Sequence, residues 1–531
     1  MNKACYLKLN LKENTFSMYP LINKKEIVIT ANISFLGKYL TDILSSFKGK
    51  KKVYMTIFAF DLNRFSKILY ENKQATITKF TYKGIIYNIT YSDVIYPGKK
   101  LIFKDCANFL HNSKEKNEEN NILHLEIIHE KMKSLFQIDI YGVNILSLVS
   151  IANAIYRKLS MDKRKLIKRL NEVEDPFIRR AYYGGRTEIM EPYYIGTSYF
   201  YDVNSLYPYV MKNNFMPIGV PRYRKKINKK EFPNFFGIIN VHVRTPKNVR
   251  LPILPIKSDD NHNNLGIIYP TGDFKGVYFS EELKLALKHG YEIIEFYDGY
   301  EFDKQILFDK FVDTLYNLRE KENNKVIKKH YKLLLNSLYG RFGCIYEEPR
   351  FLTNTENEYP YAVKRKFENV AICVAITAYA RMHMYNIIIN QKLDLLYWDT
   401  DGIIIKNLLN PSFIGTGLGK FKLVAQMTKF ICLTTKFYMY KSEGKYYYVF
   451  RGFQKEKYKI KGSVLFNYFL NELKKERKNG YELILHFDIE NKKGIIESKS
   501  FRFHNKRKLL YFPEVILTIP WYITHSISAD S

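Results

Sequence analysis

The stretch LDLLYWDTDGIIIK, residues 393–406, places two aspartates one residue apart between two apolar runs. Runs rich in Leu, Ile, Tyr and Trp are typical of strands, and Asp-Gly is a tight-turn signal. The stretch therefore predicts a β-hairpin with Asp399 and Asp401 at or beside its tip. Residues two apart in a strand share a face, so these carboxylates should repel unless a cation lies between them. A divalent metal ion meets that need; an ordinary turn with a solvated aspartate is the alternative.

A third carboxylate, Asp202, ends an aromatic, strand-like run in SYFYDVNSLYPYVM, residues 198–211. Asn204 and Ser205 can cap a helix, and Pro208 suits the first turn of that helix. An acid that leaves a strand just before a helix begins is well placed as a metal ligand beside an anion pocket. The alternative is that Asp202 only helps to cap the helix.

The stretch KKHYKLLLNSLYGRFG, residues 328–343, predicts an amphipathic helix. Lys332, Asn336 and Tyr339 are spaced i, i+4, i+7 and therefore share one face of that helix. A cation, an amide and an aromatic ring in one row suit a nucleoside triphosphate. The alternative is a packing helix whose tyrosine is buried, with Lys332 at the rim.

Composition indicates a polyanionic partner. The 531 residues include 84 Lys plus Arg against 53 Asp plus Glu, a formal net charge of +31. Such a surplus points to nucleic acid, although codon bias in an AT-rich genome also produces lysine. The five cysteines are scattered, which argues against a zinc site or a disulfide framework. The longest uncharged apolar run, 369–380, is too short to span a bilayer, so no membrane partner is expected.

Taken together, the three stretches resemble the polymerase motifs of family B DNA polymerases. DVNSLYP resembles motif A, KLLLNSLYG motif B and YWDTD motif C, in the family's order. AYYGGRTE, residues 181–188, resembles the YxGG element, and TTKFYMY, residues 434–440, resembles the KxY motif. Connecting segments such as MPIGVP and LGKFKLV resemble the organellar, linear-plasmid and viral branch, whose members are usually protein-primed.

The resemblance implies a mixed α/β fold in which an RNase H-like exonuclease domain, here degenerate, precedes a polymerase domain. The two domains are expected at 1–175 and 176–531. The polymerase subdomains are expected as palm (190–225 and 385–440), insertion (about 226–300), fingers (about 305–384) and thumb (about 441–531).

The resemblance also implies roles for individual residues. Asp202, Asp399 and Asp401 would be catalytic, and Asp202, Asp401 and the Val203 carbonyl would hold two Mg²⁺ ions. The residues expected at the nucleotide are Tyr207, Lys332, Asn336 and Tyr339. Those expected at the primer or DNA are Tyr397, Lys436, Tyr438, Tyr183, Gly184 and Gly185.

The N-terminal region departs from the family pattern. FAFDLNRFSKIL, residues 58–69, resembles the second exonuclease motif, but Asp61 and Ser66 replace its asparagine and aspartate. Glu130 is a candidate stand-in for an acid of the third motif, and Asp105 is expected to be structural. We therefore expect a domain that keeps the fold while 3′–5′ exonuclease activity is lost or severely weakened.

The function implied is a DNA-directed DNA polymerase that binds template, primer and deoxynucleoside triphosphates, with a terminal protein as a further expected partner. The alternative is a decayed, plasmid-derived polymerase that only binds DNA. A nuclease is disfavoured because its acids are missing, and an RNA-binding module because no such motif occurs. The expected location is the mitochondrion, the alternative being a viral or plasmid protein in the host cytoplasm.

Overall fold

A computed structural model of the chain divides into two compact units. The first comprises residues 1–165 and 308–368, and the second comprises 166–307 and 369–531. The domain boundary at 175 expected from the sequence stays a prediction. The structure describes residues 4–10, 15–20, 29–32, 36–46, 53–59, 62, 65, 75–82, 85–93, 99–105, 108–110, 118–142, 144–247, 249, 251–257, 267–347, 365–450, 462–479, 482–490, 496–504, 511–512 and 515–517.

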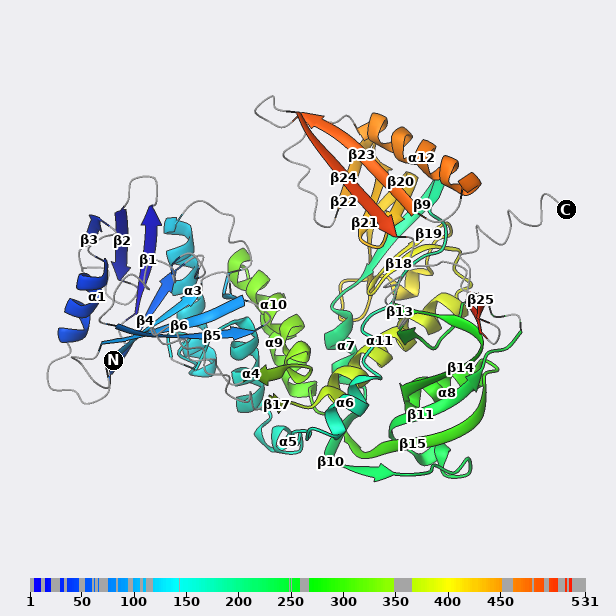
Figure 1. Cartoon of the computed structure of the whole chain (residues 1–531), viewed down its shortest axis with the longest axis horizontal. Helices are drawn as coiled ribbons and strands as arrows, with labels where there is room; N and C mark the ends of the chain where they lie inside the picture. Colours follow the sequence, from blue (N-terminus) through cyan, green and yellow to red (C-terminus); the bar gives the residue numbers. More distant parts are fainter. Residues whose placement is uncertain are drawn as a thin grey trace. The chain divides into compact units, whose positions relative to one another are not determined.

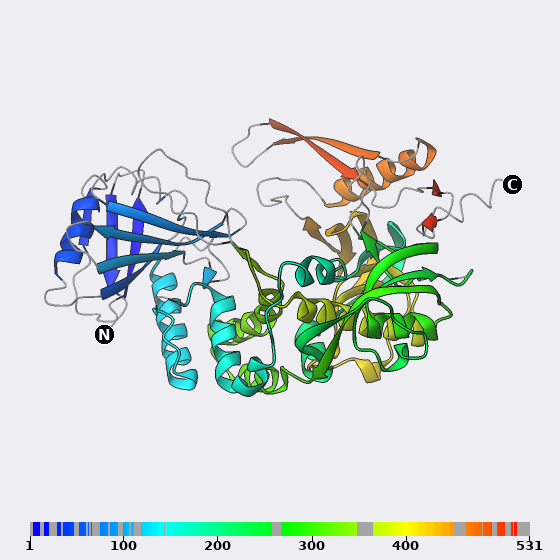
Figure 2. The ribbon, with the colours of Figure 1, turned by 60° about the horizontal axis from the view of Figure 1, so that its bottom comes forward.

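The first unit contains a mixed sheet with the strand order β3-β2-β1-β4-β7-β6-β5. Strands β1, β4 and β7 run parallel, and the hairpins β1–β2 and β5–β6 extend the sheet on either side. Buried side chains from these strands pack against Leu36, Leu40 and Leu44 of α1, which covers one face of the sheet (Figure 2). The strands are β1 (Ala4–Asn10), β2 (Thr15–Pro20), β3 (Ile29–Asn32), β4 (Val53–Ala59), β5 (Ala75–Tyr82), β6 (Ile85–Asp93) and β7 (Lys99–Asp105), and α1 spans Leu36–Ser45.

Helices and one short strand pair are the other elements described in the first unit. Helix α10 packs on α9 and α4, and it buries Tyr331, Leu334 and Leu338. Asn324 begins α10 by accepting hydrogen bonds from the backbone N–H groups of Val326 and Ile327, which explains where this helix starts. These elements are α3 (Glu118–Phe136), α4 (Leu148–Leu159), α5 (Met161–Lys165), α9 (Asp309–Lys321), α10 (Lys325–Phe342), β16 (Ile345–Glu347) and β17 (Arg365–Phe367).

The second unit is built around an antiparallel sheet, here called the central sheet, with the order β22-β21-β20-β9-β19-β18-β8 (Figure 1). Strands from distant parts of the chain are neighbours in this sheet: β9 lies between β19 and β20. Helix α12 packs on β20 and β22 through Leu465, Phe466 and Phe469. The elements are β8 (Thr187–Ile189), β9 (Tyr193–Val203), β18 (Leu395–Asp399), β19 (Gly402–Ile405), β20 (Phe421–Thr434), β21 (Phe437–Ser442), β22 (Lys445–Phe450), η4 (Pro411–Phe413) and α12 (Gly462–Asn479).

A second sheet of this unit, here called the insertion sheet, has the order β10-β15-β11-β14-β26-β25. Helix α8 packs on β11 and β14 (Figure 1). The elements are β10 (Met216–Arg224), β11 (Gly237–Arg244), β14 (Pro270–Phe279), β15 (Glu292–Gln305), β25 (Tyr511–Phe512), β26 (Val515–Leu517), η3 (Phe232–Asn234) and α8 (Ser280–Lys288). The short pair β12 (Ile256–Lys257) and β13 (Ile267–Ile268) and the hairpin of β23 (Glu482–Glu490) and β24 (Ile496–His504) complete the strands described in this unit.

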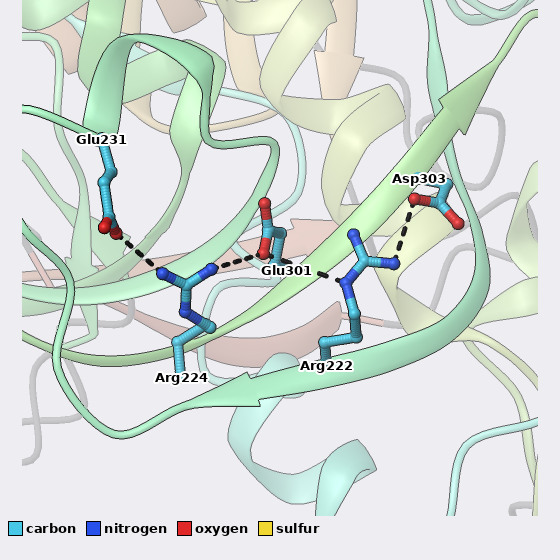
Figure 3. A network of polar contacts seen from close by, with 5 residues as sticks. All are labelled: Arg222, Arg224, Glu231, Glu301 and Asp303. Carbon is cyan, nitrogen blue, oxygen red and sulfur yellow. Dashed lines mark hydrogen bonds and ion pairs between the residues drawn. The ribbon is translucent and has the colours of Figure 1, made fainter.

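Charges of opposite sign alternate at one edge of the insertion sheet (Figure 3). Glu301 lies between two arginines: it accepts from Arg224 at 2.9 Å and lies 3.9 Å from Arg222. Beyond them, Arg222 reaches Asp303 at 3.0 Å and Arg224 reaches Glu231 at 2.7 Å. Each carboxylate in this group, called the ion-pair network below, therefore has an arginine beside it.

Helix α11 (Val370–Asn390) is the long buried helix expected from the sequence. By length and composition the whole helix could cross a bilayer, although the uncharged run 369–380 by itself is too short to do so. However, 78% of its most apolar window is buried inside the protein, and it packs on α6 (Glu174–Arg179), α7 (Leu206–Asn213) and α8. Burial of this kind is typical of a core helix.

Candidate active site

The predicted hairpin forms, and β9 lies directly beside it. In the register of the central sheet, Gly402 is paired with Asp202 on one side and with Asp399 on the other. The backbone N–H of Val203 donates to the carbonyl of Asp401 at 2.9 Å. Sheet pairing therefore places Asp202 and Asp399 on strands that flank β19, with Asp401 in the turn between β18 and β19.

The tip of the hairpin differs from the expectation. Asp399 pairs with Gly402, so the turn residues are Thr400 and Asp401, and Asp-Gly is not the turn. Asp401 is consequently carried by the turn, and the argument that residues two apart share a strand face does not apply to it. Thr400 has a φ of 61°, a left-handed conformation that is unusual for a β-branched residue. We call residues 399–402 the acid turn.

Hydrogen bonds hold the acid turn in this conformation. The backbone N–H of Thr400 donates to the carbonyl of Arg186 at 2.7 Å, and the Trp398 indole donates to the carbonyl of Thr400 at 3.2 Å. Gly185 lies against the turn, because a Cβ there would be 2.6 Å from the Thr400 side chain and 3.0 Å from the Tyr207 hydroxyl. The YxGG segment therefore supports the turn that carries Asp401.

Arg186 is a residue that the sequence patterns did not single out. Its guanidinium is buried, donates to Glu188 at 2.6 Å and to the carbonyl of Pro252 at 2.5 Å. It also lies over the rings of Tyr269 and Trp398, at 3.8 and 4.9 Å from their centroids. Burial lowers the pKa of Arg186 to about 10, so the side chain stays charged at neutral pH. These contacts fix the backbone of Arg186, whose carbonyl accepts the hydrogen bond from the N–H of Thr400.

The acids of the site differ in their electrostatic environment. Burial, and then the negative charges of Asp202 and Asp399, raise the pKa of Asp401 to about 6. Asp202 is paired with Lys422 at 2.8 Å, and Asp399 with Lys436 at 2.5 Å. Lys436 is the lysine of the KxY segment, whereas Lys422 was not among the predicted site residues. Like charge is thus concentrated at Asp401.

The aromatic residues expected at the primer end belong to the packed interior of the central sheet. Tyr397 and Tyr438 are only 1% and 5% exposed, and their ring centroids lie 5.3 Å apart. The hydroxyl of Tyr397 accepts the backbone N–H of Lys436 at 2.9 Å. Lys436 has a φ of 63°, so this hydrogen bond supports another left-handed residue beside the acids. In this structure both tyrosines are buried, and the hydroxyl of Tyr397 positions Lys436.

The helix after motif A begins where the sequence predicts, but its cap is different. Ser205 precedes α7 with a left-handed φ of 55°, and its side chain makes no capping hydrogen bond. Asn204 instead donates through its side chain to the carbonyl of Gly415 at 2.9 Å. This bond ties the end of β9 to the loop before β20. Tyr207, the residue expected at the sugar, lies half-buried in the first turn of α7.

Lys332, Asn336 and Tyr339 lie along α10 of the first unit, as the spacing predicts. Lys332 is exposed, and the other two are half-buried, on a row distinct from the buried leucines of the helix. The predicted common face of these three residues is therefore confirmed. Their nucleotide-binding role stays a prediction.

The YxGG segment is anchored from several sides. Tyr183 is buried, stacks on Tyr278 and donates to the carbonyl of Val277 at 3.2 Å. Gly184 has a φ of 74°, which favours glycine, and its carbonyl accepts from Arg381 at 2.5 Å. A DNA contact by Tyr183, Gly184 or Gly185 stays a prediction.

Residues of the exonuclease-like region are described only in part. Asp61 and Ser66 lie outside the described residues. Glu130 is exposed on α3, and Asp105 ends β7. Next to it, Lys104 is fully buried and donates to the carbonyl of Gly142 at 2.6 Å. Burial lowers the pKa of Lys104 to about 7, against the opposing effect of Asp139.

The donor set suits a hard divalent cation. Carboxylate and carbonyl oxygens are the ligands that Mg²⁺ prefers. The pKa of Asp401 is raised by burial first and then by the negative charge of its neighbours, and a cation would offset both effects. In the described part of the chain, no group of three or more His, Cys, Asp or Glu side chains is gathered closely enough to hold a metal ion. Two of the acids are instead paired with lysines, as given above.

Comparison with known proteins agrees with the motifs. Residues 119–374 match the family of DNA polymerase type B, organellar and viral. The chain is 34% identical over 338 residues to a probable DNA polymerase of Neurospora intermedia, covering 56% of this chain and 34% of the relative. It is 27% identical over 276 residues to the DNA polymerase of Streptococcus phage Cp-1, covering 47% of each chain. The resemblance to organellar and viral type B polymerases is therefore confirmed, although the chain matches only a third to a half of these relatives' length.

The fold has counterparts among solved structures. Phi29 DNA polymerase complexed with primer-template DNA and incoming nucleotide substrates superposes with a TM-score of 0.66 at 17% identity, over 95% of this chain and all of that one. The binary complex of the same polymerase with primer-template DNA gives a TM-score of 0.64 at 16% identity. The mixed α/β fold expected from the sequence is confirmed by this likeness.

Proposed function

We propose that this chain, a relative of the organellar and viral DNA polymerases of type B, is a DNA-directed DNA polymerase. It would add deoxynucleotides to a primer 3′-hydroxyl under the direction of a template. The observation that carries the proposal is the register of the central sheet, which pairs Asp202 with Gly402 of the acid turn. The names of the relatives and the net charge of +31 support the same conclusion.

In this proposal, Asp202 and Asp401 hold two Mg²⁺ ions, with the Val203 carbonyl as a further ligand. When bound, the ions would activate the primer hydroxyl and stabilise the charge on the triphosphate and the leaving pyrophosphate. Asp399 stays close to Lys436 and tunes the charge of the site. The Arg186 carbonyl holds the turn through Thr400, so that Asp401 is fixed before substrate binds.

The remaining residues would position the substrates. Lys332 would neutralise charge on the triphosphate, and Asn336 and Tyr339 would line the nascent base pair. Tyr207 would pack against the sugar and exclude ribonucleotides. Lys436 would contact the primer end, supported by Tyr397 and Tyr438.

Template-directed primer extension tests the proposal. Purified wild-type protein is given a labelled primer, a template, Mg²⁺ and one deoxynucleotide at a time. We expect addition only of the nucleotide complementary to the template, and loss of addition in Asp202→Asn. If wild-type protein binds the primer-template but adds no nucleotide, the chain is a DNA-binding remnant and the proposal fails.

We further propose a degenerate exonuclease domain, supported by the replacement of the second exonuclease motif's acid by Ser66. A primer with a mismatched 3′-end should not be trimmed, and brisk Mg²⁺-dependent trimming would refute this. Protein priming by a terminal protein is proposed from the branch resemblance, as is a mitochondrial location. An assay that compares a candidate terminal protein with a DNA primer tests the first, and cell fractionation tests the second.

A further inference from the structure

Lys422 lies where it can act on a catalytic acid. It is on β20 and is paired in register with Asp202 on the antiparallel strand β9. Directly opposed residues of antiparallel strands project to the same face of a sheet. Lys422 Nζ lies 2.8 Å from Asp202 Oδ2, with side-chain exposures of 47% and 27%. The backbone register therefore supports the ion pair independently of the side-chain conformation.

The ion pair of Lys422 and Asp202 is partly exposed and can therefore be broken readily. A partly exposed ion pair stabilises a protein only slightly, because water competes for both charges. A divalent cation carries twice the charge of an ammonium and binds the same carboxylate oxygens. An arriving cation can therefore displace Lys422 from Asp202, but it must first overcome the pair and then tolerate a positive charge nearby.

We propose that Lys422 is a positioning residue for polymerisation that holds the Asp202 carboxylate while no divalent cation is bound and competes with the cation for it. The inference rests on the proposed function, since it gives Asp202 the role of a metal ligand. It predicts that the apparent affinity of the site for divalent cations is lower than its carboxylates alone would give. Lys422 would thereby set the cation concentration at which the polymerase becomes active.

Binding of Mn²⁺ to the full chain tests the proposal without requiring activity. Free Mn²⁺ is measured by electron paramagnetic resonance, in the absence of DNA and nucleotide. The Asp202→Asn variant identifies the binding class that depends on Asp202. We expect Lys422→Met to tighten that class by roughly 3- to 10-fold, because both the competing pair and a repulsive charge are removed.

Two controls separate a local effect from a change of net charge. Lys422→Arg keeps the cation, so its Mn²⁺ affinity should stay within about twofold of wild type. Lys429→Met removes the same charge from the same strand, where the register partners are Ile195 and Lys441 and include no acid. It should also stay within about twofold. Circular dichroism and thermal melting confirm that each variant is folded.

Primer extension gives a second readout. Lys422→Met should reach half-maximal rate at a lower Mg²⁺ concentration than wild type, and this shift should be absent in Lys429→Met. Unchanged or weaker Mn²⁺ binding by folded Lys422→Met overturns the inference. Normal primer extension by wild type does not change that conclusion. Tighter binding by Lys422→Met together with no extension by wild type would sink the proposed function and leave the competition standing.

Discussion

The acid turn and the ion-pair network of the insertion sheet both contain neighbouring carboxylates, but the surroundings of these carboxylates differ. In the network, Glu301 lies between Arg222 and Arg224 (Figure 3). In the acid turn, burial and two neighbouring aspartates raise the pKa of Asp401 to about 6. In the network each carboxylate has an arginine beside it, whereas at the acid turn the pKa of Asp401 is raised although Asp202 and Asp399 are paired with lysines.

This difference indicates that an external cation would bind at the acid turn and not at the ion-pair network. Burying like charges costs stability, so an arrangement that does so needs a reason outside the folded chain. The network needs no such reason, because each acid has an arginine. The acid turn is held in place by Arg186 and Gly185. It also keeps Thr400 in a left-handed conformation, which costs free energy of folding.

The largest expected effect follows from Asp401→Asn. If the acid turn holds the catalytic cations, primer extension should fall by ~10³-fold or more, since several kcal/mol of charge stabilisation are lost. The same change should stabilise the cation-free protein. If Asp401→Asn extends primers within tenfold of the wild-type rate at saturating Mg²⁺, the acid turn does not hold the catalytic cations and does not differ from the network in this respect.

The sign of that stabilisation follows from the pKa. The folded value of Asp401 is about 6, above the usual value of an aspartate, so the folded state binds the proton more tightly. Wild-type stability therefore declines as pH rises toward and through 6, and the variant lacks this decline. In chelator at pH 7.5 we expect a gain of about 1–3 kcal/mol in urea unfolding, shrinking toward pH 4.

Gly185→Ala tests whether the support of the acid turn matters. The new methyl group would be 2.6 Å from the Thr400 side chain, so the turn must shift. We expect primer extension to fall by roughly 10- to 100-fold, because small displacements of reacting groups are costly. Gly417→Ala is the matched control, since its methyl group would make only an ordinary contact at 3.7 Å. Equal rates in both variants would show that the turn does not depend on the YxGG segment.

Lys104→Met removes a buried cation of the first unit and so tests how burial of a single charge affects stability. The folded pKa of Lys104 is about 7 and its usual value is 10.5, so the unfolded chain binds more protons between these values. Wild-type stability of this unit should therefore rise above pH 7, by about 1.4 kcal/mol per pH unit at most. Hydrogen-exchange protection of β4 and β7 measures this rise, which Lys104→Met should lack. The exposed Lys133→Met should keep it; the same slope in both variants would contradict the assignment.

The smallest effect is expected in the ion-pair network. Glu301→Gln removes the acid shared by Arg222 and Arg224, but the group is partly exposed, so we expect a loss of only about 0.5–1 kcal/mol. Primer extension should stay within twofold of wild type. Glu292→Gln, whose carboxylate is more exposed and 3.7 Å from Arg244, should cost less. A large loss of extension in Glu301→Gln would mean that the network also serves catalysis.

Local patterns were sufficient for the elements and insufficient for their partners. The hairpin of β18 and β19, helix α11 and the row of Lys332, Asn336 and Tyr339 follow from periodicity and turn signals. The turn residues did not, because Arg186 and Gly185 impose a conformation that Thr400 does not favour by itself.

The position of Lys422 could not be predicted for a related reason. Its neighbour Asp202 lies over two hundred residues earlier, and only the pairing of β9 with β20 brings the two together. The Arg186 contacts likewise depend on the carbonyl of Pro252, which carries no side-chain signal. Register between distant strands is set by packing of the whole sheet.

Binding of two cations by Asp202 and Asp401 is tested most directly by the anomalous scattering of Mn²⁺ in crystals of the protein with primer-template and a non-hydrolysable deoxynucleotide. If Asp202 and Asp401 hold two cations, two peaks about 3.5–4 Å apart should appear in contact with their carboxylates. Lys422 should then no longer contact Asp202 in that complex. Fully bound substrates with no anomalous peak at these two carboxylates would contradict the central claim.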